Sequence, residues 1–237
     1  MSIILDATFS VADLEAIYLR LAKLPSNFSD LEMSNGEDDP RNPVTLDALA
    51  RGKNLPVDPT GGYFLHAKDV TYGISFFEDE VTIFAICSSD ETASELMKAL
   101  AELPVKYGFA CQSEEREHQN RVVAKKPYGS HEAWVGRDYN RYLPGVYWLN
   151  LVPKSLLERH GVPESAIKSI AVSCAEIGGR NYLIRLFPTS SDWEKHVAEI
   201  DEWRKKSPGV FYKQEAEIAL KEAANFLEAS DATSKWK

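Results

Sequence analysis

Apolar residues recur along this chain in two spacings, which predict an alternation of strands and helices. Residues 3–9 read as a short strand, and apolar residues within 10–24 then recur at the spacing of a helix. Two later segments share one pattern. Residues 73–100 and residues 171–200 each predict a strand, a tight turn, a second strand and a helix.

The element before each of these segments also matches, so the chain divides into two halves of strand–helix–hairpin–helix type. Residues 146–152 followed by a helix over 154–160 correspond to residues 3–24. The halves cover about 1–112 and 135–237. Hairpins that alternate with helices predict an α+β protein with antiparallel sheets covered by helices. An internal duplication and a chance likeness of two ordinary units both remain open. The candidate capping boxes at the two later helices are Ser88 with Glu91 and Ser191 with Glu194.

Two other stretches complete the predicted organisation. Residues 25–62 are irregular and rich in proline, with a short helix expected at 45–50. A last helix is expected over 213–228, followed by a frayed tail.

Composition narrows the function classes. The chain has 27 Lys and Arg residues against 36 Asp and Glu residues, a formal charge of −9. This balance argues against direct binding to nucleic acid, where neutralised phosphates supply most of the affinity. It suits a basic protein partner, although acidity also serves solubility alone. Three widely separated cysteines favour free thiols, and neither a secretory signal nor a membrane span is recognisable. We therefore expect a cytoplasmic protein that acts without a membrane.

No residue pattern announces an active site. No two of the five histidines lie within four residues of each other, which argues against paired metal ligands, and no phosphate-binding glycine loop is complete. His131 has Ser130 and Glu132 as neighbours, but a hydrolase triad needs groups that converge in space. We expect no catalytic residue, cofactor or metal.

The densest aromatic run, RDYNRYLPGVYWLNLVPKSLLERHGV, covers residues 137–162. Residues 146–152 predict a strand covered on both faces, which makes Tyr147 and Trp148 core residues or else part of a binding anchor. The motif RDYNRYLPGVYWLN followed by LLERHGV resembles bacterial immunity proteins of polymorphic and type VI secreted toxins. Among such families it resembles the immunity protein 52 family. The likeness is local to residues 137–162, and the α+β order of the whole chain is compatible with it.

The resemblance implies one immunity-type domain over residues 1–237 that binds and blocks a cognate toxin without enzymatic activity. For this family the expected toxin is a nuclease with a restriction-endonuclease-like fold, whose basic groove an acidic inhibitor can cover. Such protection requires a dissociation constant on the order of nanomolar or tighter. We predict partner-binding residues in two acidic runs and in the lead-in segment, residues 137–141, before the aromatic strand. They are Glu37, Asp38, Asp39, Glu78, Asp79, Glu80, Arg137, Asp138, Tyr139 and Arg141.

Two other function classes stay open. One is a small-molecule hydrolase built on His131 or His66 with distant carboxylates, in which replacing the general base would lower the rate about 10²–10⁴-fold. The other is an adaptor that associates with itself through hairpin edges or the C-terminal helix. The sequence leaves both a monomer and a homodimer open.

Overall fold

The computed structural model describes residues 2–24, 31–36, 38–45, 48–49, 61–68, 70–127 and 129–236. About half of the irregular stretch at 25–62 lies outside these residues. Of the helix expected at 45–50, residues 45, 48 and 49 are described, and the Leu49 amide donates to the Thr45 carbonyl at 3.1 Å. The strands are β1 (Ile3–Ser10), β2 (Glu32–Ser34), β3 (Asn42–Pro43), β4 (Gly62–His66), β5 (Val70–Phe77), β6 (Glu80–Cys87), β7 (Tyr107–Gln112), β8 (Arg121–Lys126), β9 (Gly129–Trp134), β10 (Leu149–Pro153), β11 (Ser173–Ile177) and β12 (Asn181–Arg185). The α-helices are α1 (Leu14–Leu21), α3 (Asp90–Leu100), α4 (Ser113–Asn120), α5 (Lys154–His160), α6 (Glu164–Lys168), α7 (Trp193–Lys206), α8 (Gln214–Glu222) and α9 (Phe226–Ser234).

Ten of the described strands form one sheet in the order β11-β12-β10-β7-β1-β6-β5-β4-β2-β3. Every ladder in it is antiparallel. The predicted α+β class is confirmed, although both halves contribute to one continuous sheet. The central strand, β7, belongs to neither hairpin, because it pairs with β1 on one side and β10 on the other. Each half supplies the predicted strand, hairpin and helices. Their origin by duplication stays a prediction.

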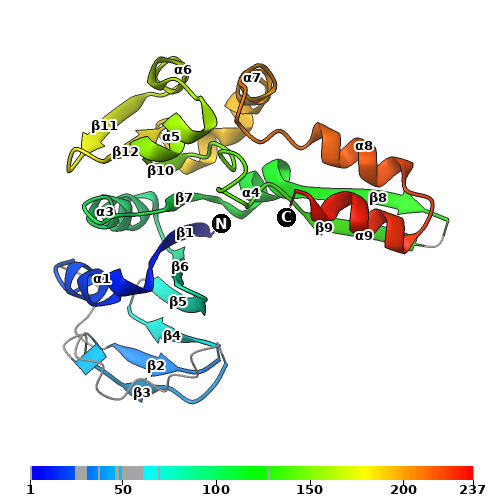
Figure 1. Ribbon diagram of the computed structural model, residues 1–237. Helices are drawn as coiled ribbons and strands as arrows, with labels where there is room; N and C mark the ends of the chain where they lie inside the picture. The colour runs from blue at the N-terminus through cyan, green and yellow to red at the C-terminus, as the bar shows by residue number, and fades with distance from the viewer. Residues whose placement is uncertain are drawn as a thin grey trace.

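The helices of the first half cover one face of the sheet. Alternate residues of β1 point to opposite faces, so Leu5, Ala7 and Phe9 are buried while Asp6 and Thr8 are half-buried on the other side. In Figure 1, α1 and α3 lie on one side of the stacked strands. Ser89 caps the start of α3, because its hydroxyl accepts a hydrogen bond from the Thr92 amide at 3.1 Å, so the predicted cap at Ser88 is off by one residue.

The helices of the second half lie on the opposite face. Tyr182 and Arg185 are an odd number of residues apart on β12 and therefore point to opposite faces. Arg185 reaches Ser94 of α3, whereas Tyr182 donates to Glu164 of α6. Ahead of α7, the capping box is formed by Thr189 and Asp192, so the expected pair Ser191 and Glu194 is wrong.

An arm projects from this second face, made of the hairpin β8–β9 covered by α8 and α9 (Figure 1). It has its own apolar cluster, separate from the main core, which includes Val122, Val135, Phe211 and Leu220. The single helix expected over 213–228 is wrong. The chain breaks at 223–225, where the Asn225 side chain caps α9 by accepting from the Glu228 amide at 3.0 Å.

The expected frayed tail is wrong as well. Residues up to Ser234 are helical, and Trp236 packs against the arm cluster. The Trp236 carbonyl accepts hydrogen bonds from the Gly136 amide at 2.5 Å and the Tyr142 hydroxyl at 2.8 Å. Among the described residues, no helix has the length and apolar character needed to cross a membrane.

Candidate partner-binding surface

Several loops of the molecule meet at one end of the sheet, which we call the turn end. The pairing of Phe77 with Glu80 puts the β5–β6 turn there, and the pairing of Ser10 with Glu80 adds the start of the first helix. Lys106 precedes β7 at the same end, because Tyr107 pairs with Thr8. The α5 helix also begins there, since Leu151 pairs with Gly108 and the strand then runs on to Pro153.

Glu80 is the centre of a polar cluster on the turn end. Its carboxylate accepts a hydrogen bond from the Tyr139 hydroxyl and another from Lys106 Nζ at 2.8 Å. Asp79 lies 3.7 Å from the same ammonium group. Burial, the bond to Glu80 and nearby carboxylates raise the pKa of the Tyr139 hydroxyl above its ordinary value. Tyr139 is therefore a fixed hydrogen-bond donor at neutral pH.

The lead-in segment is held in a defined turn beside this cluster. Asp138 Oδ1 accepts from the Asn140 amide at 2.9 Å, and Asp138 also forms an ion pair with Arg141 at 3.0 Å. Arg141 Nη1 donates to the Lys235 carbonyl at 2.6 Å. His160 Nε2 donates to the Tyr139 carbonyl at 2.8 Å, which ties the turn to the end of α5.

A hollow of about 300 Å³ opens between this cluster and α5. Glu80, Lys106 and Tyr139 line one wall, and Ser155, Leu156 and Arg159 of α5 line the other. Arg159 Nη1 donates weakly to Asn140 Oδ1 at 3.3 Å. The hollow therefore brings together a proton donor, two cations and a carboxylate from four separate segments of the chain.

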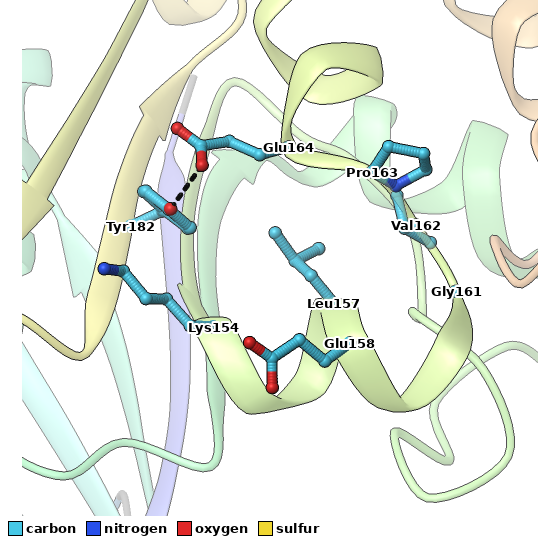
Figure 2. Close-up of a pocket in the computed structure, with 8 residues that line it drawn as sticks. All are labelled: Lys154, Leu157, Glu158, Gly161, Val162, Pro163, Glu164 and Tyr182. Atoms are coloured by element: carbon cyan, nitrogen blue, oxygen red, sulfur yellow. Dashed lines mark hydrogen bonds between the residues drawn. The ribbon is translucent and has the colours of Figure 1, made fainter.

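A second hollow of about 330 Å³ lies on the other side of α5 (Figure 2). Leu157 points into it from the helix, and Tyr182 and Glu164 meet across it through a hydrogen bond of 2.7 Å. Lys154 lies 5.5 Å from the Tyr182 ring centre and pairs with Glu176 at 2.7 Å. The α5 helix is thus a ridge between two hollows, and both are lined by residues of the 137–162 segment.

An exposed aromatic side chain stands at the tip of the β5–β6 turn. Phe77 is 73% exposed, and it lies directly across the ladder from Glu80 on the same face. Glu78, at φ 54°, occupies the left-handed region in the two-residue turn that follows. We did not single out Phe77 from the sequence. The alternation of β5, in which Thr71, Ser75 and Phe77 share the less covered face, is the signal that would have identified it.

The other predicted site residues are dispersed. Asp38 and Asp39 are exposed in the turn after β2, which reaches the same end of the sheet two strands beyond β5, and Glu37 lies outside the described residues. Arg137 lines a different hollow, of about 380 Å³, beside α9 of the arm. The structure therefore places residues 78–80 beside residues 138–141, whereas Arg137 lines a separate hollow.

Tyr147 and Trp148 are core residues, which confirms the packing interpretation. They are 2% and 0% exposed. The expected strand over 146–152 begins only at Leu149. Asn150 interrupts its start by accepting from the Tyr147 amide at 2.8 Å and donating to the Tyr147 carbonyl at 2.7 Å.

In the contacts that the structure describes, neither histidine suggested for a hydrolase accepts a proton from a hydroxyl group. His131 is buried edge-on against Phe226 at 5.0 Å, whereas Glu132 points to the opposite face and pairs with Arg121 at 2.6 Å. His66 Nε2 lies 2.9 Å from the Ser34 hydroxyl, which donates its only proton to the Gly36 carbonyl at 2.6 Å. His66 therefore donates to Ser34, and a general base would have to accept from it.

Within the part of the chain that the structure describes, no group of three or more His, Cys, Asp or Glu side chains is placed to hold a metal ion. Comparisons with protein-family profiles, curated proteins and solved structures find no match to this chain.

Proposed function

We propose that this chain is an immunity-type protein that binds and neutralises a cognate secreted toxin, a type VI effector nuclease of restriction-endonuclease-like fold. The observation that carries the proposal is the composition of the turn end. There, segments far apart in sequence present an exposed aromatic ring, an acidic turn and two hollows beside one helix. Large aromatic and charged side chains around pockets are the features that dominate protein–protein binding energy.

The resemblance of residues 137–162 to the immunity protein 52 family bears on the same surface. The buried part of the segment, Tyr147 and Trp148, belongs to the core. Its lead-in and its helix line the hollows on both sides of α5. A segment that combines a buried anchor with an exposed rim is well suited to hold a binding surface in a fixed geometry.

Charge favours a basic partner over an acidic one. The whole chain carries −9, and Glu78 and Asp79 are at the exposed tip of the β5–β6 turn. The two hollows contain Lys106, Lys154 and Arg159, so the surface also offers donors to carboxylates of the partner. Complementary charges of this kind raise association rates and reject wrong partners.

The test is affinity capture of the tagged full chain from a lysate of the cell that makes it, followed by mass spectrometry after washing at moderate salt. We expect one stoichiometric partner that carries a basic nuclease domain. Adding the pure chain should abolish the nuclease activity of that partner at equimolar concentration. A partner of another class, or undiminished nuclease activity, would reject the proposal.

One observation favours the adaptor alternative. Phe226 and Leu227 begin α9 and are 62% and 74% exposed at the end of the arm. Adjacent exposed apolar side chains mark association surfaces. A self-associating chain would show this contact without any foreign partner.

A further inference from the structure

The face of the sheet that carries α3 has a further hollow, remote from α5 and lined by cations. It has a volume of about 470 Å³, within the range of small-molecule sites. Leu149, Arg185 and Ser173 lie in one row across β10, β12 and β11, and Leu183 is in the next row. Directly paired residues share a face, so these side chains form the floor of the hollow.

One wall is α3, which contributes Ser94 and Lys98. The sheet extends past this helix, because β12 and β11 lie beyond β10 at the edge of the sheet order. Val172 at the rim is 61% exposed. The hollow is therefore a step between the side of a helix and an uncovered part of the sheet.

Arg185 is held in place by its surroundings. Its Nη2 donates to Ser94 Oγ at 3.0 Å, and its guanidinium carbon lies 5.6 Å from the centre of the Trp148 ring. Nη1 makes only a marginal contact of 3.5 Å with the Pro188 carbonyl. Guanidinium has five N–H donors, so described residues use less than half of the hydrogen-bonding capacity of Arg185.

The charge of this hollow is opposite to that of the protein. Lys98 and Arg185 line it, and no Asp or Glu is among the described residues that do. Neither cation forms an ion pair with any carboxylate in the described part of the chain. The whole chain has a net charge of −9, so this hollow differs from the rest of the protein. It combines an apolar floor with two cations that form no ion pair among the described residues.

We infer that this hollow binds a small organic anion, a carboxylate that carries an apolar chain. Arg185 and Lys98 take the carboxylate, with the hydroxyl groups of Ser94 and Ser173 beside them. The chain of the ligand lies on Leu149 and Leu183. This site is independent of the proposed toxin-binding surface, which lies at the turn end of the sheet.

Octanoate is the test ligand, with acetate and octanol as partial ligands that lack the chain or the charge. Titrations of the ¹⁵N-labelled full chain are followed by NMR. A ligand of this size is expected to bind with a dissociation constant of roughly 1 mM. Shifts should centre on α3, β11 and β12, and octanoate should bind about tenfold more tightly than either control. Equal affinity for octanol, or no saturable binding up to about 10 mM, overturns the inference.

Variants locate the site. Lys98→Gln and Arg185→Gln should each weaken octanoate binding about three- to tenfold, because each removes one charged donor. Lys154→Gln, in the hollow of Figure 2, is the matched control and should leave octanoate binding unchanged. Lys98 is exposed and forms no hydrogen bond or ion pair among the described residues, so its variant decides the outcome if Arg185→Gln perturbs Trp148. Unchanged binding in Lys98→Gln, or an equal loss in Lys154→Gln, rejects the site.

Discussion

The hydroxyl of Tyr147 donates a hydrogen bond to Oδ1 of Asn120 at 2.6 Å. This bond connects the segment that precedes β10 with the last residue of α4. The Tyr147 ring stacks on Phe109 of β7 at 4.2 Å. Asn120 Nδ2 donates in turn to the Val135 carbonyl at 2.9 Å, just beyond β9. A tyrosine of the 137–162 segment therefore fastens the base of the arm to the sheet.

Replacing Tyr147 with Phe should lower the free energy of unfolding by roughly 1–2 kcal/mol, because a buried amide oxygen loses its donor. Urea denaturation measures the change. Tyr139→Phe is the control, since its hydroxyl bonds to the partly exposed Glu80, and it should cost less than about 1 kcal/mol. Equal losses in the two variants would show that burial of the Asn120 contact is unimportant.

Gly209→Ala should destabilise the chain by more than about 3 kcal/mol. Gly209 has φ 80°, and a Cβ atom there would lie 2.0 Å from the His160 carbonyl oxygen at the end of α5. Gly178→Ala is the matched control, because φ is 59° and no described residue lies within 4 Å of the added atom. This control variant should lose only about 1 kcal/mol of unfolding free energy, the cost of placing alanine in the left-handed region. Thermal and urea unfolding distinguish the two, and similar losses would contradict the steric argument.

Glu115 should make the protein less stable as pH rises above the ordinary glutamate pKa. Burial raises the pKa of its carboxyl well above 4.5, opposed by the Trp148 backbone bond and by Arg204. Between 4.5 and this raised pKa, the folded chain keeps a proton that the unfolded chain has released. The free energy of unfolding therefore falls as pH rises through that window.

Glu115→Gln cannot ionise and should flatten this slope. Urea denaturation of both proteins at several values between about pH 5 and 8 isolates the contribution as a difference. Asp192 acts in another window, because bonds from Lys195 and Thr189 lower its pKa to about 2 and its stabilisation is lost only as pH falls below 3.8. Parallel curves for the wild type and Glu115→Gln would contradict the prediction.

Charge reversal at the acidic turns tests the binding surface once a partner is captured. Glu78→Lys with Asp79→Lys should slow association about tenfold at low salt and weaken its salt dependence. The equivalent pair Asp38→Lys with Asp39→Lys tests the turn two strands away. Stopped-flow association rates measure both, and an unchanged rate removes the corresponding turn from the interface.

Phe77→Ala should instead accelerate dissociation, by about tenfold or more if the ring fills a pocket of the partner. Its 73% exposure means that stability should change by less than about 0.5 kcal/mol. A dissociation rate equal to that of the wild type would exclude Phe77 from the interface.

Phe226→Ser with Leu227→Ser tests self-association through the arm. If α9 mediates a homodimer, these variants should halve the mass measured by light scattering at concentrations where the wild type is dimeric. Val172→Ser, also an exposed apolar residue but on the sheet edge, should leave the mass unchanged. A monomeric wild type at about 100 µM would end the adaptor alternative.

Periodicity in the sequence predicted the elements whose burial is one-sided. β5, β6 and α3 follow from the alternation and helical spacing over 73–100, because each buries one face against the same core. The arm was not predicted. Its hairpin alternates only weakly, with Val123 exposed between Val122 and Ala124, and its apolar cover comes from α8 and α9 about 90 residues later. No sequence pattern within the hairpin indicates that helices so far along the chain will cover it.

The candidate partner-binding surface was also only partly predictable from the sequence. The acidic turn and the lead-in segment could be identified as polar and exposed, but not as neighbours. Glu80 and Tyr139 meet only because β7 places Lys106 and α5 at the same end of the sheet. Sequence spacing also grouped Arg137 with Tyr139, although two residues along an irregular segment are enough to direct them to different hollows.

The central position of β7 determines the order in which this chain can complete its fold on the ribosome. β1 is synthesised first, yet one of its neighbours is β7, about 100 residues later, and β7 itself lacks its second neighbour until β10 has emerged. Until then the nascent chain presents the unpaired amide and carbonyl groups of β7 to its surroundings. We therefore expect that a chain truncated before β10 aggregates.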